Sequence, residues 1–137
     1  MKKLAIVTIV ILIALTAVRL YALARSQNIK RVGMIIGIKP DKISAYEALH
    51  AASNPGVRDL LTKYHMNDFS IFIQRVDDSH YYLFGYYEYT GSDYEGDMAR
   101  LAAEPRNKQW LSTTDPLQIP LPGQKSWTIM NQVYHNQ

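Results

Sequence analysis

Strand-like and helix-like segments alternate along this chain, and their order limits the possible folds more than any other feature of the sequence. Residues 31–38 place apolar side chains at every second position, which predicts a strand with one buried face. The strand-like residues 68–76 and the Tyr-rich residues 81–90 are separated by a short polar turn, which predicts a hairpin. Apolar residues at helical spacing follow Asp41 and Asp93, so we predict a mixed α and β fold.

The complete order is β-α-β-β-α-β, with one additional helical piece at about residues 57–64 and a final strand over residues 126–134. Residues 93–104 are expected to form the second main helix, which Pro105 interrupts and a short helical piece continues to Trp110. Residues 112–124 contain three prolines and are expected to form a loop. This order is typical of a ferredoxin-like α+β fold, an antiparallel sheet with its helices on one face. The other face of such a sheet needs a cover, and its aromatic residues favour a second subunit or a ligand. We therefore predict a ferredoxin-like domain of the dimeric α+β barrel type over residues 27–137, with a homodimer as the expected assembly.

The first residues form a leader whose composition differs from that of the rest. Two lysines precede an uncharged run over residues 4–18. If this is a signal peptide, Ala22-Leu23-Ala24 is its cleavage site, with small residues at the first and third positions. If it is an anchor, residues 4–24 form a hydrophobic helix of about 31 Å, which is long enough to span a bilayer. We expect residues 1–26 to be a signal peptide or a transmembrane anchor, and the protein to be exported (periplasmic or secreted) or membrane-anchored in the cell envelope.

The charge of the chain is divided unevenly between the leader and the rest. The formal net charge is +3, but residues 1–31 hold six basic residues and no acidic one. The remaining residues carry nine basic and twelve acidic side chains, and a slightly acidic domain is a poor binder of nucleic acid.

The chain has no cysteine, which excludes disulfides, thiolate zinc sites and cysteine nucleophiles. Its four histidines are scattered and form no cluster with metal-ligand spacing, so we expect no metal. We also expect no cofactor and, because of the acidic balance, no nucleic-acid partner.

Two residues one helical turn apart are the first candidates for chemistry. Tyr46 and His50 share one face of the helix predicted after Asp41. A His with a pKa near neutral can give and take a proton, and a phenol can orient a sugar hydroxyl. Trp110 could offer a flat face to a sugar ring. The alternatives are a partly buried structural His and a core Trp, and the residues alone leave both open.

Several motifs resemble those of one family of small sugar isomerases. The resemblance covers roughly residues 31–134 and rests on the order and spacing of the motifs. The motifs are the run Arg31–Lys39, Pro40-Asp41, Tyr46-x-x-x-His50, Asn54-Pro55, the hairpin segments 68–72 and 83–88, and residues 102–111. In this order they are similar to the L-rhamnose mutarotases.

This resemblance implies a dimeric ferredoxin-like fold without a metal, and an isomerase that interconverts the α and β anomers of a monosaccharide, L-rhamnose. It assigns His50 as the catalytic proton donor and Tyr46 as a substrate-binding residue. Trp110 matches the first of two adjacent substrate-binding tryptophans, and Leu111 stands in the place of the second. Phe69 stands where the family has a substrate-binding Tyr. We therefore expect His50 to be catalytic and the other four residues to line the sugar site.

The chain departs from the family in the segment after His50. Ala51, Ala52 and Ser53 separate this His from the Asn-Pro pair, which follows it at once in the family. The hydrophobic leader is a second departure. We expect residues 27–137 to be a mutarotase-like domain acting on a hexose or deoxyhexose. The alternatives are a non-catalytic sugar- or partner-binding module on the same scaffold, and a small cofactor-free or haem-dependent monooxygenase.

Overall fold

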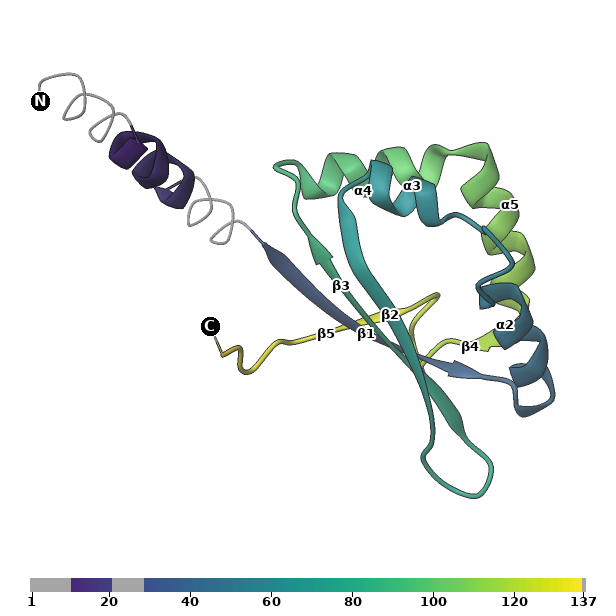
Figure 1. The fold of residues 1–137 in the computed structure, drawn as a ribbon. Helices are drawn as coiled ribbons and strands as arrows, with labels where there is room; N and C mark the ends of the chain where they lie inside the picture. Colours follow the sequence, from purple (N-terminus) through teal and green to yellow (C-terminus); the bar gives the residue numbers. More distant parts are fainter. Residues whose placement is uncertain (1–10, 21–28, 137) are drawn as a thin grey trace, which may run out of the picture.

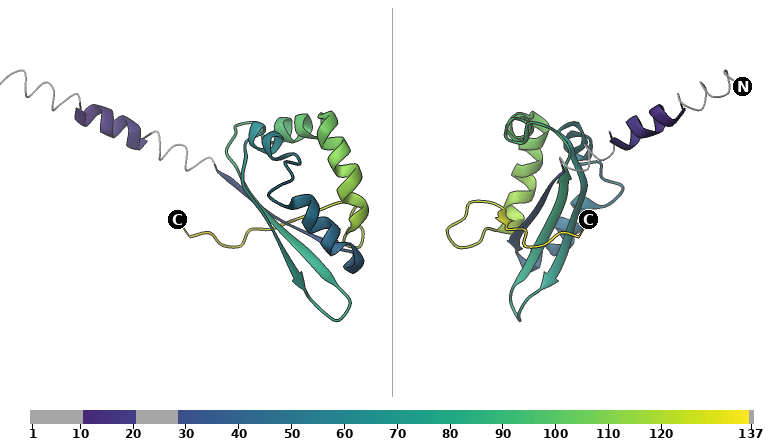
Figure 2. Two further views of the ribbon diagram at one scale, coloured as in Figure 1. Left: turned by 45° about the vertical axis from the view of Figure 1, so that its right-hand side comes forward. Right: turned by 90° about the vertical axis from the view of Figure 1, so that its left-hand side faces the viewer.

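The structure, a computed structural model, describes residues 11–20 and 29–136. Within residues 29–136, one antiparallel sheet carries the helices on one of its faces (Figure 1, Figure 2). The strands are β1 (Lys30–Ile38), β2 (Met66–Arg75), β3 (Tyr81–Tyr89), β4 (Gln118–Ile119) and β5 (Thr128–Met130). The helices are α2 (Ile43–His50), α3 (Arg58–Lys63), α4 (Tyr94–Ala103) and α5 (Pro105–Thr114), with the 3-10 turns η1 (Pro40–Lys42) and η2 (Asp115–Leu117).

The strands lie in the order β2-β3-β1-β4, and β5 also pairs with β1. Each of these pairings is antiparallel. β4 and β5 share one edge of β1, β4 beside its end and β5 beside its middle, so together they take the place of one last strand. The β-α-β-β-α-β order is that of the ferredoxin-like fold. The predicted α+β fold, with an antiparallel sheet and helices on one face, is therefore confirmed.

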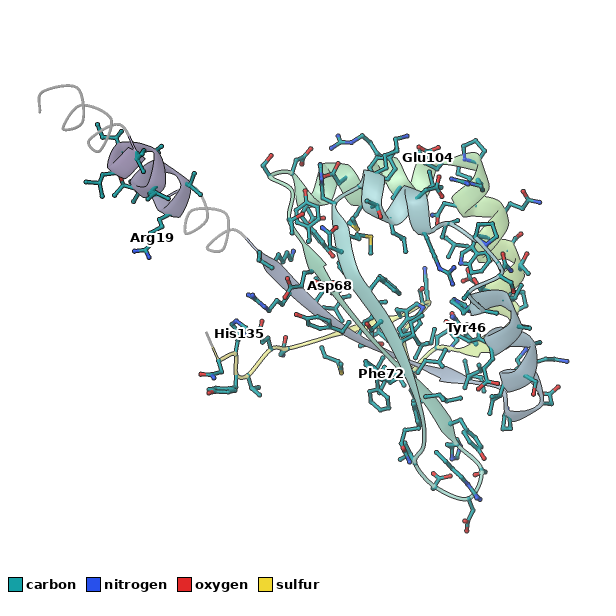
Figure 3. The ribbon with its side chains drawn as sticks, in the orientation of Figure 1. Arg19, Tyr46, Asp68, Phe72, Glu104 and His135 are labelled. Carbon is teal, nitrogen blue, oxygen red and sulfur yellow. The ribbon has the colours of Figure 1, made fainter. Side chains whose placement is uncertain are left out.

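Alternation along β1 places the hydrophobic core between the sheet and the helices. Val32 and Ile36 are buried, whereas Ile35 is partly exposed on the opposite face of the strand. Tyr46, on α2, points into the space between the helices and the sheet, and Phe72, on β2, points away from it (Figure 3). The two-residue period of a strand explains why Val32 and Ile36 of β1 face the core while Ile35 faces the other way.

The last strand differs from the prediction. Only residues 128–130 of the predicted strand 126–134 pair with β1, and residues 118–119, which were predicted to lie in a loop, form β4. Pro120 and Pro122 follow β4, and a proline has no N–H to donate to a sheet. The chain therefore leaves the edge of β1 after β4 and returns to it at β5.

The last helix is longer than predicted. The sequence predicts an interruption at Pro105 and a short helical piece to Trp110, but α5 begins at Pro105 and ends at Thr114. Proline fits the first position of a helix, since the N–H there has no partner within the helix. The additional turn carries Leu111 and Thr114 on the same helix as Trp110.

The leader lies partly outside the described residues. Residues 11–20 are helical, and all their side chains are exposed. The Thr16 hydroxyl donates to the Leu12 carbonyl at 2.6 Å, so this polar group is satisfied within the helix. Residues 1–10 and 21–28 are outside the described ranges, and the signal peptide or anchor expected over residues 1–26 stays a prediction. Within residues 11–20 and 29–136, no helix combines the length and the apolar character that crossing a membrane requires.

Candidate active site

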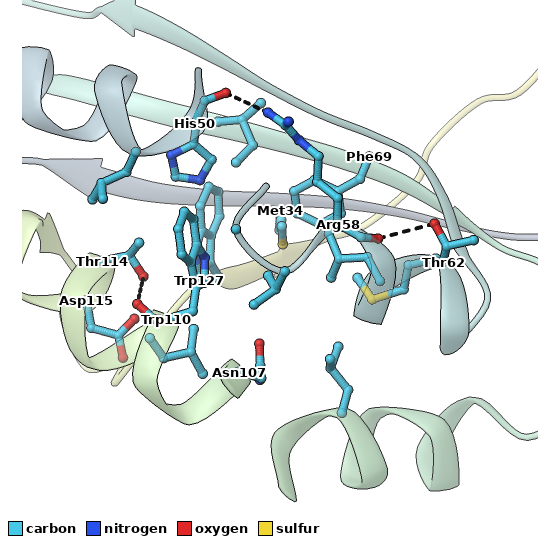
Figure 4. Close-up of a pocket in the computed structure, with 18 of the residues that line it drawn as sticks. Met34, His50, Arg58, Thr62, Phe69, Asn107, Trp110, Thr114, Asp115 and Trp127 are labelled. Carbon is cyan, nitrogen blue, oxygen red and sulfur yellow. Dashed lines mark hydrogen bonds between the residues drawn. The ribbon is translucent and has the colours of Figure 1, made fainter. Parts of the chain in front are cut away.

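A pocket of about 710 Å³ lies between the helices and the inner face of the sheet (Figure 4). Its volume falls in the range of small-molecule sites. Strands β1 and β2, helices α2 to α5, and the segment that joins α2 to α3 contribute to its walls. The structure brings all five predicted site residues to this pocket. They are Tyr46, His50, Phe69, Trp110 and Leu111.

His50, the last residue of α2, is held by contacts on three sides. Its Nδ1 lies 2.9 Å from the carbonyl oxygen of Tyr46, one turn earlier in the helix. A carbonyl can only accept, so in the neutral ring Nδ1 carries the proton and Nε2 is the nitrogen left for a ligand. The imidazole stacks on the Tyr46 ring with centroids 4.2 Å apart, and it meets the Trp110 ring edge-on at 5.2 Å. The orientation of the His50 ring is thus fixed before any ligand enters.

The surroundings of His50 favour its neutral form. Burial is the main cause that lowers the pKa of His50 below its ordinary value of 6.5, and the positive charge of Arg58 lowers it further. The hydrogen bond to the Tyr46 carbonyl opposes this shift. At neutral pH the free Nε2 is therefore a proton acceptor.

Tyr46 serves His50 mainly with its ring. The residue is 5% exposed and belongs to a core cluster with Ile36, Ile38 and Leu83. Burial raises the pKa of the Tyr46 phenol to about 12, so it stays protonated and donates hydrogen bonds. A buried ring below the imidazole gives His50 a rigid support.

Trp110 lies against the segment that follows His50. The backbone of Gly56 passes so close to the indole that a Cβ at this position would lie 3.2 Å from Cη2. Gly56 also has a φ of +53°, a conformation that favours glycine. This glycine therefore lets the α2–α3 segment pack closely against Trp110.

Phe69 reaches the pocket from an irregularity in β2. The pairing with β3 changes register between Asn67 and Ser70, and Asp68 within this β-bulge has a φ of +50°. Bulges redirect side chains and are common beside active sites. The Phe69 ring stacks on Tyr87 with centroids 5.6 Å apart and forms an apolar part of the wall. Leu111, which is 39% exposed, adds a second apolar side chain.

Sequence reasoning missed many residues of the pocket wall, among them Arg58, Asn107, Asp115 and Trp127. Asn107 is buried, and its side chain points toward the cavity (Figure 4). Burial raises the pKa of the Asp115 carboxyl, which lies just after α5. Trp127 packs against both core clusters, and an inward position in the last strand could have revealed it. No spacing signal in the sequence marks the other three.

The described residues offer no metal centre. Among residues 11–20 and 29–136, no three His, Asp or Glu side chains lie close enough together to hold a metal ion. The pocket's titratable groups are instead His50, the Asp68 and Asp115 carboxylates, Arg58 and the Tyr46 phenol. Acid–base chemistry and hydrogen bonding are what this set can supply.

The model of the L-rhamnose mutarotase family matches residues 31–136. This chain belongs to that family. The resemblance predicted from the order of the motifs is thereby confirmed, and an isomerase-type enzyme is what the mutarotase family implies. No curated protein matches the chain.

Two solved structures are similar to the mutarotase domain. The L-rhamnose mutarotase from Formosa agariphila has a TM-score of 0.59 at 17% identity, and the match covers 79% of this chain and 99% of that one. A protein from Nitrosomonas europaea, provisionally assigned as an antibiotic biosynthesis monooxygenase, has a TM-score of 0.49 at 16% identity, over 78% of this chain and 92% of that one. At these identities, the likeness to the Formosa protein supports the fold alone.

Proposed function

We propose that this protein interconverts the α and β anomers of a hexose or deoxyhexose, with L-rhamnose as the first sugar to test, and that His50 moves the protons. The family match supports the reaction type. The observation that carries the residue assignment is the fixed imidazole, whose Nδ1 is bonded to its own helix and whose Nε2 is left for a ligand in the pocket.

The reaction needs one proton removed from the anomeric hydroxyl and one delivered to the ring oxygen. Neutral His50 accepts the hydroxyl proton at Nε2 while the bond between C1 and the ring oxygen breaks and C1 becomes an aldehyde carbon. The imidazolium then returns its proton to the former ring oxygen, directly or through one water. Rotation about C1–C2 presents the other face of the aldehyde, and the reverse steps close the ring as the other anomer. Acid–base help of this kind contributes about 10²–10⁴-fold.

The pocket walls suit a sugar with both an apolar and a polar side. Trp110 and Phe69 present aromatic surfaces, which pack against the C–H groups of a pyranose ring. Asn107 and Asp115 supply polar atoms that can bond to hydroxyl groups. Leu111 and Phe69 carry no hydrogen-bonding group, so this protein makes fewer polar contacts there than the family pattern implies.

Exchange NMR on a panel of reducing sugars tests the proposal. Magnetisation transfer between the α and β anomeric protons is expected to speed up for at least one hexose or deoxyhexose when the protein is added. Heat-denatured protein is the control. Acceleration for none of the sugars, with the protein folded, would contradict the proposed activity.

The alternative is a sugar- or partner-binding module without catalysis, and the apolar side chains at Phe69 and Leu111 favour it. The same spectra separate the two functions. Saturation transfer from protein to sugar without faster anomer exchange indicates binding alone. Faster exchange supports the mutarotase.

We further propose that the leader takes the protein to the cell envelope. The uncharged run over residues 4–18 behind two lysines supports this, as do the exposed apolar side chains of residues 11–20. Fusing the chain to a reporter that is active only outside the cytoplasm tests it. An active reporter is expected, and an inactive reporter on a fully soluble chain with an intact N-terminus would contradict the proposal.

A further inference from the structure

Arg58, the first residue of α3, reaches back to the end of α2. Its Nη2 donates to the carbonyl oxygen of His50 at 2.9 Å (Figure 4). The same Nη2 donates to the Ala51 carbonyl at 3.0 Å, and Nη1 lies 3.4 Å from the Ala52 carbonyl. The last carbonyls of a helix have no N–H partner within the helix, and a cation there also interacts favourably with the helix dipole. One side chain therefore satisfies the end of α2 and the first residues after it.

The segment that Arg58 holds passes beside the catalytic candidate and its aromatic neighbour. It joins α2 to α3, begins directly after His50, and packs at Gly56 against the Trp110 ring. Within it, the Gly56 N–H donates to the Asn54 side-chain oxygen at 3.1 Å. Movement of this segment would displace both the backbone of His50 and the surface against which Trp110 rests.

Arg58 is also the charged residue that acts on His50. Three influences set the His50 pKa: burial, which lowers it, the Tyr46 carbonyl, which raises it, and the charge of Arg58, which lowers it. Two carboxylates line the same pocket from other elements, Asp68 on β2 and Asp115 on η2, and neither is among these influences. The positive charge therefore acts in the same direction as the burial.

We propose that Arg58 is a positioning residue of the active site, which fixes the end of α2 so that His50 faces the pocket. The forked guanidinium suits this task, because one side chain bonds several carbonyls in a fixed geometry. This inference rests on the proposed function, since a positioning role matters for activity only if His50 transfers the proton.

The experiment compares two variants of the full-length protein in two measurements, an NMR titration of the His50 imidazole and the anomerisation rate across pH. Arg58→Met removes the charge and the hydrogen bonds. The His50 pKa is expected to rise by about half a unit, and the rate at pH 6 to fall about tenfold. Arg58→Lys keeps the charge and loses the fork. Its His50 pKa is expected to stay within about 0.2 units of the wild-type value, while the rate falls about threefold.

Arg106→Met is the matched control. Arg106, on α5, bonds the carboxylate of Asp59, the residue that follows Arg58 on α3. Arg106→Met also removes an exposed arginine whose side chain is bonded close to the start of α3. It is expected to leave the His50 pKa and the anomerisation rate unchanged. If Arg58→Met and Arg106→Met show the same His50 pKa and the same anomerisation rate, the inference is overturned.

Two further outcomes keep this test decisive. If Arg58→Met does not fold, Arg58→Lys decides, and a folded Arg58→Lys with the wild-type rate would overturn the inference. If the wild-type protein does not accelerate anomer exchange, the proposed function fails, whereas the titration of His50 in the variants still reports whether Arg58 controls its pKa.

Discussion

At the scale of single residues, the pocket separates the support of His50 from its reactivity. Tyr46 below the ring, Trp110 at its edge and the carbonyl at Nδ1 fix the orientation of the imidazole. None of these contacts uses Nε2. A preoriented base avoids the loss of freedom that a mobile side chain would suffer in the transition state.

Lowering the pH should reduce activity only below the ordinary His pKa. Because the pKa of folded His50 is lowered from 6.5, the neutral base persists in the folded protein below that pH. The acid limb of kcat/KM against pH is therefore expected to lie below pH 6.5 and to report this group in the free enzyme. An acid limb above pH 6.5 would show that burial does not control His50.

The same shift links stability to pH with a definite sign. As pH falls below 6.5, the unfolded chain takes up a proton at His50 before the folded protein does. This group's contribution to the free energy of unfolding therefore falls from about pH 6.5 down through the folded pKa. The difference between wild type and His50→Gln in urea unfolding at several pH values measures this contribution.

At the scale of elements, α4 begins at a cap that is readable from the sequence. Asp93 accepts a hydrogen bond from the Gly96 N–H at 3.0 Å and pairs with Arg100. Asp93→Ala is expected to cost about 1 kcal/mol of unfolding free energy, whereas Asp93→Asn should cost less because Asn also caps helices well. Urea unfolding of both variants measures the difference. Equal stability of the Ala variant and the wild type would contradict a role for this cap.

Local patterns predicted some elements well and others poorly, for physical reasons. The two-residue period of β1 and the helical spacing of Tyr46 and His50 reflect burial on one face, so they were visible in the sequence. The start of α5 was misread because a proline can either interrupt a helix or begin one. The bulge at Asp68 carries no glycine that would announce its positive φ.

The parts of the site that escaped prediction depend on contacts between distant elements. Arg58 bonds carbonyls six to eight positions away across a turn, and no side-chain pattern encodes the path of that turn. Asn107 and Asp115 became pocket residues only once α5 and η2 were placed over the sheet. Helical spacing marked Tyr46 and His50, and the residue type marked Trp110, whereas Phe69 and Leu111 came from the family pattern alone.

At the scale of the whole molecule, the face of the sheet away from the helices carries an apolar row. Phe72, Phe84 and Ile35 are direct neighbours across β2, β3 and β1, and Phe72 is 63% exposed. A patch of this kind on a small domain indicates a partner surface, and a second copy would cover it symmetrically. We expect a homodimer through this face.

A charge within this apolar row should prevent dimerisation. Phe72→Glu is expected to sediment as a folded monomer, because two carboxylates would be buried without partners in the interface. Ala103→Glu, on the exposed end of α4, is the control and should remain dimeric. Wild-type protein that is a stable monomer at micromolar concentration would contradict the expected assembly.

The rate of exchange between the two anomers of L-rhamnose, measured in the presence of wild type, Tyr46→Phe and His50→Ala, tests the central claim most directly. Wild type should accelerate the exchange. Tyr46→Phe keeps the ring below His50 and loses one hydroxyl, which is worth about 0.5–1.5 kcal/mol, so its rate should fall by only about 2- to 13-fold. His50→Ala should lose about a hundredfold or more while thermal unfolding shows that it is folded. A folded His50→Ala with the wild-type rate would contradict the account.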